Sequence, residues 1–305
     1  MPELPEVETV RRGLAELVVG HRLAGLEVRE PKSFVAAGST EPGRHLVGAT
    51  ITAARRRGKV LLLDLDTDHC LVIHLKMTGQ LVHQSDGDHW GAGHPNDSLI
   101  GELPDRSTRI ILDFDDGATL FFNDQRKFGW IQLLPAAEVG RIPLLAAMGP
   151  EPLEGDPWPE FLLRVRRHQA TSIKAALLNQ EVLAGVGNIY ADEALWSARI
   201  HPATPVGRLR DDRLAELLDA ARDVMERSLA LGGSTARTYV DAQGRPGAYL
   251  SFAAVFRREG KPCLRCGETI VKTRVAGRGT HLCPSCQRLP RARRTAPASR
   301  SARCG

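Results

Sequence analysis

Two pairs of cysteines near the C-terminus constrain the fold of this 305-residue chain more than any other feature. They read C-L-R-C and C-P-S-C, with sixteen residues between the pairs: Cys263, Cys266, Cys283 and Cys286. Two C-x-x-C pairs at this separation are typical of a tetrahedral zinc site, in which each pair forms one knuckle. Disulfides are the alternative, and they fit poorly with a chain that shows no export signal.

A zinc ion held by these cysteines has a structural rather than a catalytic role, because four thiolates leave no open coordination position. About thirty residues surround the site, too few for a core of their own, so we expect the metal to hold this segment folded. One Zn²⁺ is the cofactor that the sequence predicts. Of the other two cysteines, Cys70 lies in an apolar run and is expected in the core, and Cys304 lies in the tail.

The charge of the chain is concentrated at one end. Residues 257–305 contain 13 Lys/Arg and 2 acidic residues, a net charge of +11, while the preceding 256 residues contain 28 basic and 34 acidic residues, a net charge of −6. A basic module on a slightly acidic body favours a polyanion as partner; a solvated, solubilising tail is the alternative. We see no apolar run long enough to span a membrane and no signal peptide, so we expect a cytoplasmic protein without a membrane partner.

Hydrophobic periodicity divides the chain into a β-rich part and a helical part. The N-terminal helix is predicted from apolar residues at steps of three and four, and strand-like runs follow it, two of them joined by an Asp-Gly turn. The predicted units are 1–135, a β-rich domain with a leading helix; 136–159, a proline-rich linker; 160–231, helical; 232–256, a glycine-rich connection; 257–288, the zinc segment; and 289–305, a basic disordered tail. Residues 83–106 are expected to form an irregular loop.

A second cluster of signals lies in the helical part. A helix over 173–179 is predicted to meet a glycine-bearing turn at 184–187, and another helix starts at Asn188. Turn amides and a helix N-terminus make a phosphate site, to which Lys174 and Asn188 can each add a contact. Taken alone, the G-V-G turn is a weak signal, and a plain turn between two helices is the better interpretation.

Several motifs together resemble those of bacterial formamidopyrimidine-DNA glycosylases, and they occur in the order typical of that family. They are P-E-L-P-E-V-E-T-V-R-R-G-L, R-R-G-K-V-L-L-L-D-L, H-L-K-M-T-G, N-D-Q-R-K-F-G, G-V-G-N-I-Y-A-D-E-A-L-W and the four-cysteine finger. The match runs from Pro2 to about Gln287. It implies an α+β multidomain fold, with an N-terminal β-sandwich and a helix-two-turns-helix domain that carries a β-hairpin zinc finger. DNA is expected in the cleft between them.

The resemblance gives the opening residues a chemical role. If the initiator methionine is removed, the secondary amine of Pro2 can attack a sugar C1′ and displace a damaged base. An α-amino group titrates near ~8, against ~10.4 for a lysine side chain, so a larger fraction is a neutral nucleophile at pH 7. By resemblance Glu3 is the general acid/base and Glu6 supports the geometry. A favourable helix N-terminus explains Pro5 and Glu6 equally well, but it does not explain Pro2.

The resemblance also assigns two basic residues to the later steps. Lys59 matches a proton donor in the elimination that cuts the strand, and its alternative is a surface lysine that neutralises phosphate. Arg278, in the loop between the zinc knuckles, matches the arginine that holds the phosphate beside the lesion and assists the second elimination. A fixed guanidinium fork suits phosphate oxygens.

Flipping a base out of DNA leaves a gap that something must fill. By resemblance Met77, Arg126 and Phe128 enter the duplex, with Arg126 facing the orphaned cytosine; seen alone, Met77 and Phe128 are more often core residues. Two positions depart from the family pattern at DNA contacts. Ser107 stands where many members have a phosphate-binding histidine, and Gln169 stands where a lysine often contacts DNA.

Met77, Arg126 and Phe128 are called the wedge residues below, and further departures from the family pattern surround them. Lys76 replaces the usual glycine, and Gln125 and Lys127 replace the usual proline and arginine. None of them touches the proposed chemistry. The resemblance therefore implies a monomeric, bifunctional DNA glycosylase/AP lyase of base excision repair, acting on duplex DNA with oxidised purines in the bacterial cytosol. The alternatives are an endonuclease VIII-like enzyme for oxidised pyrimidines and a non-catalytic DNA-binding zinc protein, which would be expected to lose Pro2, Glu3 or Lys59.

Overall fold

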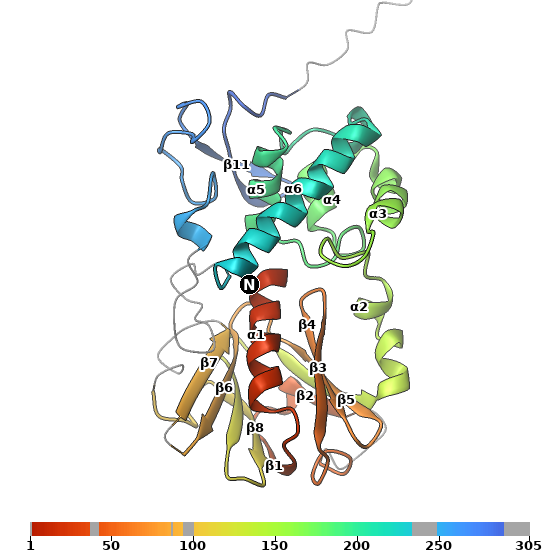
Figure 1. The fold of residues 1–305 in the computed structure, drawn as a ribbon, viewed down its shortest axis with the longest axis vertical. Helices are drawn as coiled ribbons and strands as arrows, with labels where there is room; N and C mark the ends of the chain where they lie inside the picture. Colours follow the sequence, from red (N-terminus) through yellow and green to blue (C-terminus); the bar gives the residue numbers. More distant parts are fainter. Residues whose placement is uncertain (1, 37–42, 87, 94–100, 234–248, 290–305) are drawn as a thin grey trace, which may run out of the picture.

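A computed structural model describes residues 2–36, 43–86, 88–93, 101–233 and 249–289. The described chain has a β-rich half and a helical half, with the N-terminus at their junction (Figure 1). The tail 290–305 and most of the glycine-rich connection, 234–248, lie outside the described residues. Within the described ranges, no helix combines the length and the apolar character that crossing a membrane requires.

The β-rich half is a sandwich of two five-stranded sheets. The first has the order β1-β8-β9-β6-β7: β1 Leu23–Val28, β8 Thr108–Phe114, β9 Thr119–Asp124, β6 Gly79–Ser85 and β7 Asp88–Gly93. The second has the order β2-β10-β5-β4-β3: β2 Phe34–Ala36, β10 Trp130–Pro135, β5 His69–His74, β4 Val60–Leu65 and β3 Ile51–Arg57. Neighbouring strands are antiparallel except β2 and β10. Alternating apolar residues of both sheets form one buried core between them.

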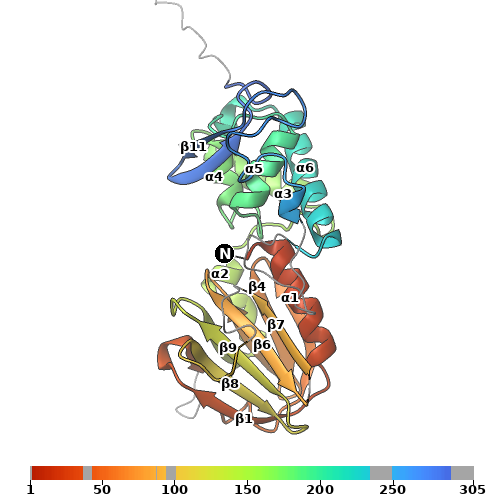
Figure 2. The same ribbon diagram turned by 90° about the vertical axis from the view of Figure 1, so that its left-hand side faces the viewer.

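The first helix, α1 (Leu4–Leu17), connects the two halves (Figures 1 and 2). Val7, Val10 and Leu14 on its buried face belong to the sandwich core, as the predicted periodicity requires. Leu4 instead lies in the core of the helical half. The N-terminus is therefore anchored on both sides, at a place where chain ends usually fray.

Two short helices connect the β-rich half to the helical half: η3 Ala136–Arg141 and α2 Pro143–Ala146. The helices of the helical half itself are α3 Trp158–Val165, η4 Arg166–His168, α4 Ile173–Leu178, α5 Asn188–Ser197, η5 Val206–Arg208, α6 Asp211–Ala230 and η6 Tyr249–Ser251. A two-stranded hairpin ends the described chain: β11 Val271–Val275 and β12 Arg278–Leu282. The fold is thus α+β, as the sequence predicted.

One local prediction is corrected by the strands. Part of the expected loop 83–106 forms a regular hairpin, because β7 pairs with β6 along its whole length; residues 94–100 lie outside the described chain. The predicted linker, 136–159, contains the short helices η3 and α2. Cys70 is fully buried on β5, as predicted.

Candidate active site

Pro2 lies directly before the first turn of α1, at the junction of the two halves (Figure 2). Glu3 is the N-cap of the helix, and a capping box joins it to Glu6: the Glu3 amide donates to Oε2 of Glu6 at 2.8 Å. The next amide, that of Leu4, donates to the carbonyl of Gly185 at 3.0 Å. These bonds fix the backbone on both sides of Glu3, so the position of the preceding Pro2 is closely defined.

The carboxylate of Glu3 lies at the N-terminus of α5, where it accepts hydrogen bonds from the amides of Ile189 at 3.0 Å and Tyr190 at 3.4 Å. Burial raises the pKa of Glu3 to about 7, against the opposing charge of Lys59. A side chain at position 187 would displace the carboxylate of Glu3, because a Cβ there would lie 2.2 Å from Cδ of Glu3. A carboxyl group with this pKa exchanges its proton near neutral pH.

This arrangement agrees with a plain turn between two helices, the interpretation that the sequence favoured over a phosphate site. Two amides at the start of α5 are already bonded to Glu3. Gly185 has a φ of 86°, which favours glycine, and a Cβ there would lie 2.5 Å from a methyl group of Leu4. The G-V-G turn therefore makes room for the N-terminal residues rather than for a phosphate.

Glu6 is held from the opposite side by Tyr190. The tyrosine hydroxyl donates to Oε1 of Glu6 at 2.5 Å and lies 2.6 Å from Oγ of Ser228 on α6. Burial raises the pKa of Tyr190 well above its usual value, so the phenol remains a donor. The other oxygen of Glu6 accepts from the Glu3 amide. Glu6 therefore links the N-terminus to Tyr190 on α5 and, through Tyr190, to Ser228 on α6.

Lys59 follows the tight turn between β3 and β4, where Gly58 has a φ of 55°. Its Nζ donates to the carbonyl of Val186 at 2.9 Å, and the residue is only 6% exposed. Burial lowers the pKa of Lys59, while the charges of Glu3 and Glu6 oppose this shift. The lysine is thus close enough to Glu3 for each to influence the ionisation of the other.

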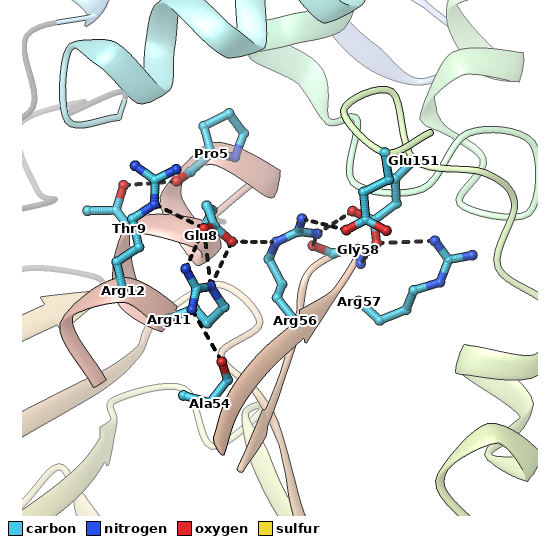
Figure 3. A network of polar contacts seen from close by, with 11 residues as sticks. Pro5, Glu8, Thr9, Arg11, Arg12, Ala54, Arg56, Arg57, Gly58 and Glu151 are labelled. Atoms are coloured by element: carbon cyan, nitrogen blue, oxygen red, sulfur yellow. Dashed lines mark hydrogen bonds and ion pairs between the residues drawn. The ribbon is translucent and has the colours of Figure 1, made fainter. Parts of the chain in front are cut away.

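A buried carboxylate that the sequence did not single out holds the turn that carries Lys59 (Figure 3). Glu151 accepts from the Gly58 amide at 2.7 Å, from Nη1 of Arg57 at 3.1 Å and from Nη1 of Arg56 at 2.5 Å. Arg56 also reaches Glu8 on α1, at 3.2 Å. A glutamate in a proline-rich stretch gives no signal for this role, because its partners lie more than ninety residues earlier.

The three residues expected to enter DNA form one cluster in the β-rich half. Nη1 of Arg126 lies 3.2 Å from the Met77 sulfur, and its guanidinium lies 5.0 Å from the centre of the Phe128 ring. Met77 is 45% exposed and Phe128 is 54% exposed, which excludes the core location that apolar residues usually have. Large apolar side chains exposed next to an arginine suit insertion between bases.

Asp124 at the end of β9 organises the two loops that carry this cluster. Its carboxylate binds the Thr78 hydroxyl and accepts from the amides of Arg126 at 3.1 Å and Gly129 at 2.6 Å. Lys76 and Lys127 have positive φ angles of 50° and 56°, respectively. The left-handed backbone at position 76 is a conformation that glycine adopts more readily than lysine.

The four cysteines converge in the finger, as predicted, and their sulfur atoms all lie within 4.8 Å of one another. Three of the six Sγ–Sγ distances are 3.5, 3.5 and 4.0 Å. A tetrahedron with Zn–S bonds of about 2.3 Å has sulfur atoms about 3.8 Å apart, so the site fits zinc. Four cysteines hold the ion, and they leave it a structural role.

Arg278 is exposed at the start of β12, directly after the hairpin turn Ala276-Gly277. Its charge contributes to lowering the pKa of both Lys59 and Lys174, which places the guanidinium within electrostatic reach of both lysines. The hairpin thus brings a basic group toward the junction where Pro2, Glu3 and Lys59 lie. The larger part of the loop expected to cap the lesion, residues 234–248, lies outside the described chain.

The remaining predicted DNA contacts differ in their accessibility. Two are corrected because their polar atoms are buried and engaged: the Ser107 hydroxyl donates to Asp105 at 2.8 Å, and the Lys174 ammonium is ion-paired with Asp192. Gln169 is exposed. Oδ1 of Asn188 is buried and has no hydrogen-bond partner in the part of the chain that the structure describes.

Comparisons with known proteins cover almost the whole chain. Residues 1–131 match the formamidopyrimidine-DNA glycosylase N-terminal domain, residues 148–240 match the H2TH domain of the same enzymes, and residues 260–289 match the zinc finger found in FPG and IleRS. The formamidopyrimidine-DNA glycosylase of Pelotomaculum thermopropionicum is 39% identical, over 95% of this chain and all of the relative. That of Chloroflexus aurantiacus is 42% identical, over 94% and 98%.

Solved structures give the same result. A mutant of the Lactococcus lactis FPG in complex with Fapy-dG-containing DNA superposes with a TM-score of 0.81 and 34% identity, over 94% of this chain and all of that one. MutM in complex with DNA containing carbocyclic 8-oxo-G gives a TM-score of 0.81 at 33% identity, with the same coverage.

Proposed function

The chain belongs to the formamidopyrimidine-DNA glycosylase family, and from that premise we propose how its residues excise a damaged base. It is a bifunctional DNA glycosylase/AP lyase of base excision repair that acts on duplex DNA containing oxidised purines. The observation that supports our assignment of the chemistry is the position of the N-terminus, which is fixed between the two halves beside Glu3 and Lys59.

The nucleophile is the secondary amine that Pro2 presents once Met1 is removed. Its lone pair forms a bond to C1′ of the flipped nucleotide, and the N-glycosidic bond breaks as the base leaves with its electron pair. The C1′–O4′ bond of the sugar then breaks, the proton of the attacking amine passes to O4′, and an iminium ion forms between Pro2 and C1′. This cation acidifies the C2′ proton, whose removal allows the C3′–O bond to break; a second elimination breaks the C5′–O bond.

Glu3 moves the protons of these steps. Because the pKa of Glu3 is about 7, a substantial fraction of its carboxyl group is protonated at neutral pH and can donate the proton that the departing base takes up. The carboxylate left behind can then accept the C2′ proton. Lys59 is held at the same junction by the Val186 carbonyl and supplies the proton needed in the elimination. Glu6 keeps the Glu3 backbone in place through the capping box.

Binding and base flipping use groups outside this proton-transfer centre. Met77 and Phe128 fill the gap left by the flipped base, while Arg126 pairs with the orphaned cytosine. Arg278 binds the phosphate beside the lesion, and Asn188 and Gln169 add contacts to the backbone. We place the reaction in the bacterial cytosol, where the chromosome lies.

Excision from labelled duplexes tests this function. We expect base release and strand cleavage from DNA with a single 8-oxoguanine opposite cytosine, and slower cleavage of a matched duplex with an oxidised pyrimidine. Lys59→Met is expected to slow strand cleavage more than base release. Cleavage of the oxidised pyrimidine alone would favour the endonuclease VIII-like alternative, and binding without any cleavage would favour a non-catalytic DNA-binding protein.

A further inference from the structure

A buried ion pair joins the helical half to the zinc hairpin. Nζ of Lys174, on α4, lies 2.6 Å from Oδ1 of Asp192, on α5, and both side chains have no solvent exposure. The same Nζ donates to the Gly279 carbonyl at 2.9 Å and to Oγ1 of Thr280 at 2.8 Å, both on β12. An ammonium has three N–H donors, so all the donors of Lys174 have protein acceptors and none is left for DNA.

The link continues to the backbone of Arg278. The Thr280 hydroxyl donates to the Arg278 carbonyl at 3.0 Å, and Thr280 is fully buried. The second oxygen of Asp192 accepts from the amide of His281 at 2.9 Å. One carboxylate therefore holds β12 twice: directly at His281, and through Lys174 at Gly279 and Thr280.

The hydrogen bonds of Lys174 and Asp192 depend on the direction of approach of their partners, whereas an apolar contact does not. Burial lowers the pKa of Lys174, which shows the cost of removing its charge from water, and Asp192 offsets that cost. A buried charged network stabilises a fold only when all its donors and acceptors are hydrogen-bonded. The hydrogen bonds of Lys174 and Asp192 can all form at only one position of β12 relative to α4 and α5. The facing strand β11 is exposed at 271–274, and its ion pair between Lys272 and Glu259 is exposed to solvent as well.

We infer that Asp192, Lys174 and Thr280 are positioning residues that hold Arg278 at the phosphate beside the lesion. This inference rests on the proposed role of Arg278 in the function above. Zinc fixes the base of the finger through its cysteines, whereas the Asp192–Lys174–Thr280 link fixes the end of the hairpin from which Arg278 projects. Lys174 therefore acts on DNA through Arg278 rather than through a phosphate contact of its own.

Thr280→Val tests the link with little change in shape, because valine replaces the hydroxyl with a methyl group. Thr273→Val is the matched control: Thr273 pairs with Thr280 across the hairpin but is exposed. We expect Thr280→Val to slow single-turnover strand cleavage about tenfold, as the loss of a hydrogen bond to a charged group implies. We expect the zinc content to be unchanged. The dependence of log K for DNA binding on log salt concentration should become shallower by an amount that corresponds to about one phosphate contact at most. Thr273→Val should match the wild type.

A double-mutant cycle with Arg278→Ala separates positioning from general stability. If the link acts through Arg278, Thr280→Val changes the rate of single-turnover strand cleavage by less than about twofold in the Arg278→Ala background. The inference is overturned if Thr280→Val behaves as wild type, or if it costs the same factor in both backgrounds. Asp192→Asn should follow Thr280→Val; should it fail to fold, the threonine variants still decide. Normal cleavage by Arg278→Ala would overturn the role of Arg278 and the inference with it, whereas a wild-type protein that releases no base would overturn the proposed function.

Discussion

Replacing the buried carboxyl of Glu3 with an amide should stabilise the protein while it destroys activity. Burial raises the pKa of Glu3 from 4.5 to about 7, so the folded state keeps a proton that the unfolded state releases. Stability therefore falls as the pH rises from about 4.5 to about 7 and then stays level. A shift of this size corresponds to about 3 kcal/mol above neutral pH. Glu3→Gln removes this penalty and keeps an oxygen that can accept from the amides of Ile189 and Tyr190.

The assay is thermal unfolding of wild type and Glu3→Gln between pH 4.5 and 8.5. We expect the variant to gain stability with rising pH, by a negligible amount at pH 4.5 and by about 3 kcal/mol at pH 8. Glu16→Gln is the matched control, because Glu16 is exposed on the same helix; it should show no such trend. A Glu3→Gln variant that is less stable than wild type at pH 8, or whose difference from wild type does not depend on pH, would refute the reasoning.

Two further changes probe the finger and the wedge. Cys283→Ser should lose zinc and DNA binding together, since four thiolates hold one ion and the hairpin depends on it; full activity without zinc would contradict this. Arg126→Ala should narrow the preference for cytosine over adenine opposite the lesion by roughly ten- to a hundredfold, because a bidentate pair gives ~1–3 kcal/mol of discrimination. Excision rates in both contexts at two salt concentrations measure it, and an equal loss in both contexts with a steep fall in the salt slope would make Arg126 a phosphate contact.

The fold could be predicted wherever the pattern is local. The periodicity of α1, the Asp116-Gly117 turn between β8 and β9, and the cysteine pairs of the finger each depend on residues close in sequence, and all three are confirmed. Strand β7 was not predicted because its sequence, D-H-W-G-A-G, contains two glycines and an aspartate, which have little strand propensity. Its pairing with β6 at the edge of a sheet overrides that preference.

The site could be predicted only in part, because burial depends on contacts between distant segments. The resemblance assigned Met77 and Arg126 to the same task in DNA, and the structure places their side chains in contact. From the sequence, Lys174 was assigned a phosphate contact, because a lysine close to a glycine turn suggests one. The strand that buries this lysine lies more than a hundred residues later in the sequence. Glu151 had no signal for the same reason.

Mapping the covalent adduct tests the central claim most directly. The protein is incubated with duplex DNA carrying one 8-oxoguanine opposite cytosine, the iminium is reduced with borohydride, and the adduct is located by proteolysis and mass spectrometry. We predict a single adduct on the peptide that begins with Pro2, and none with protein that retains Met1, although that protein should still bind DNA. An adduct on Lys59, or full trapping by protein that verifiably retains Met1, would contradict the assignment of Pro2 as the nucleophile.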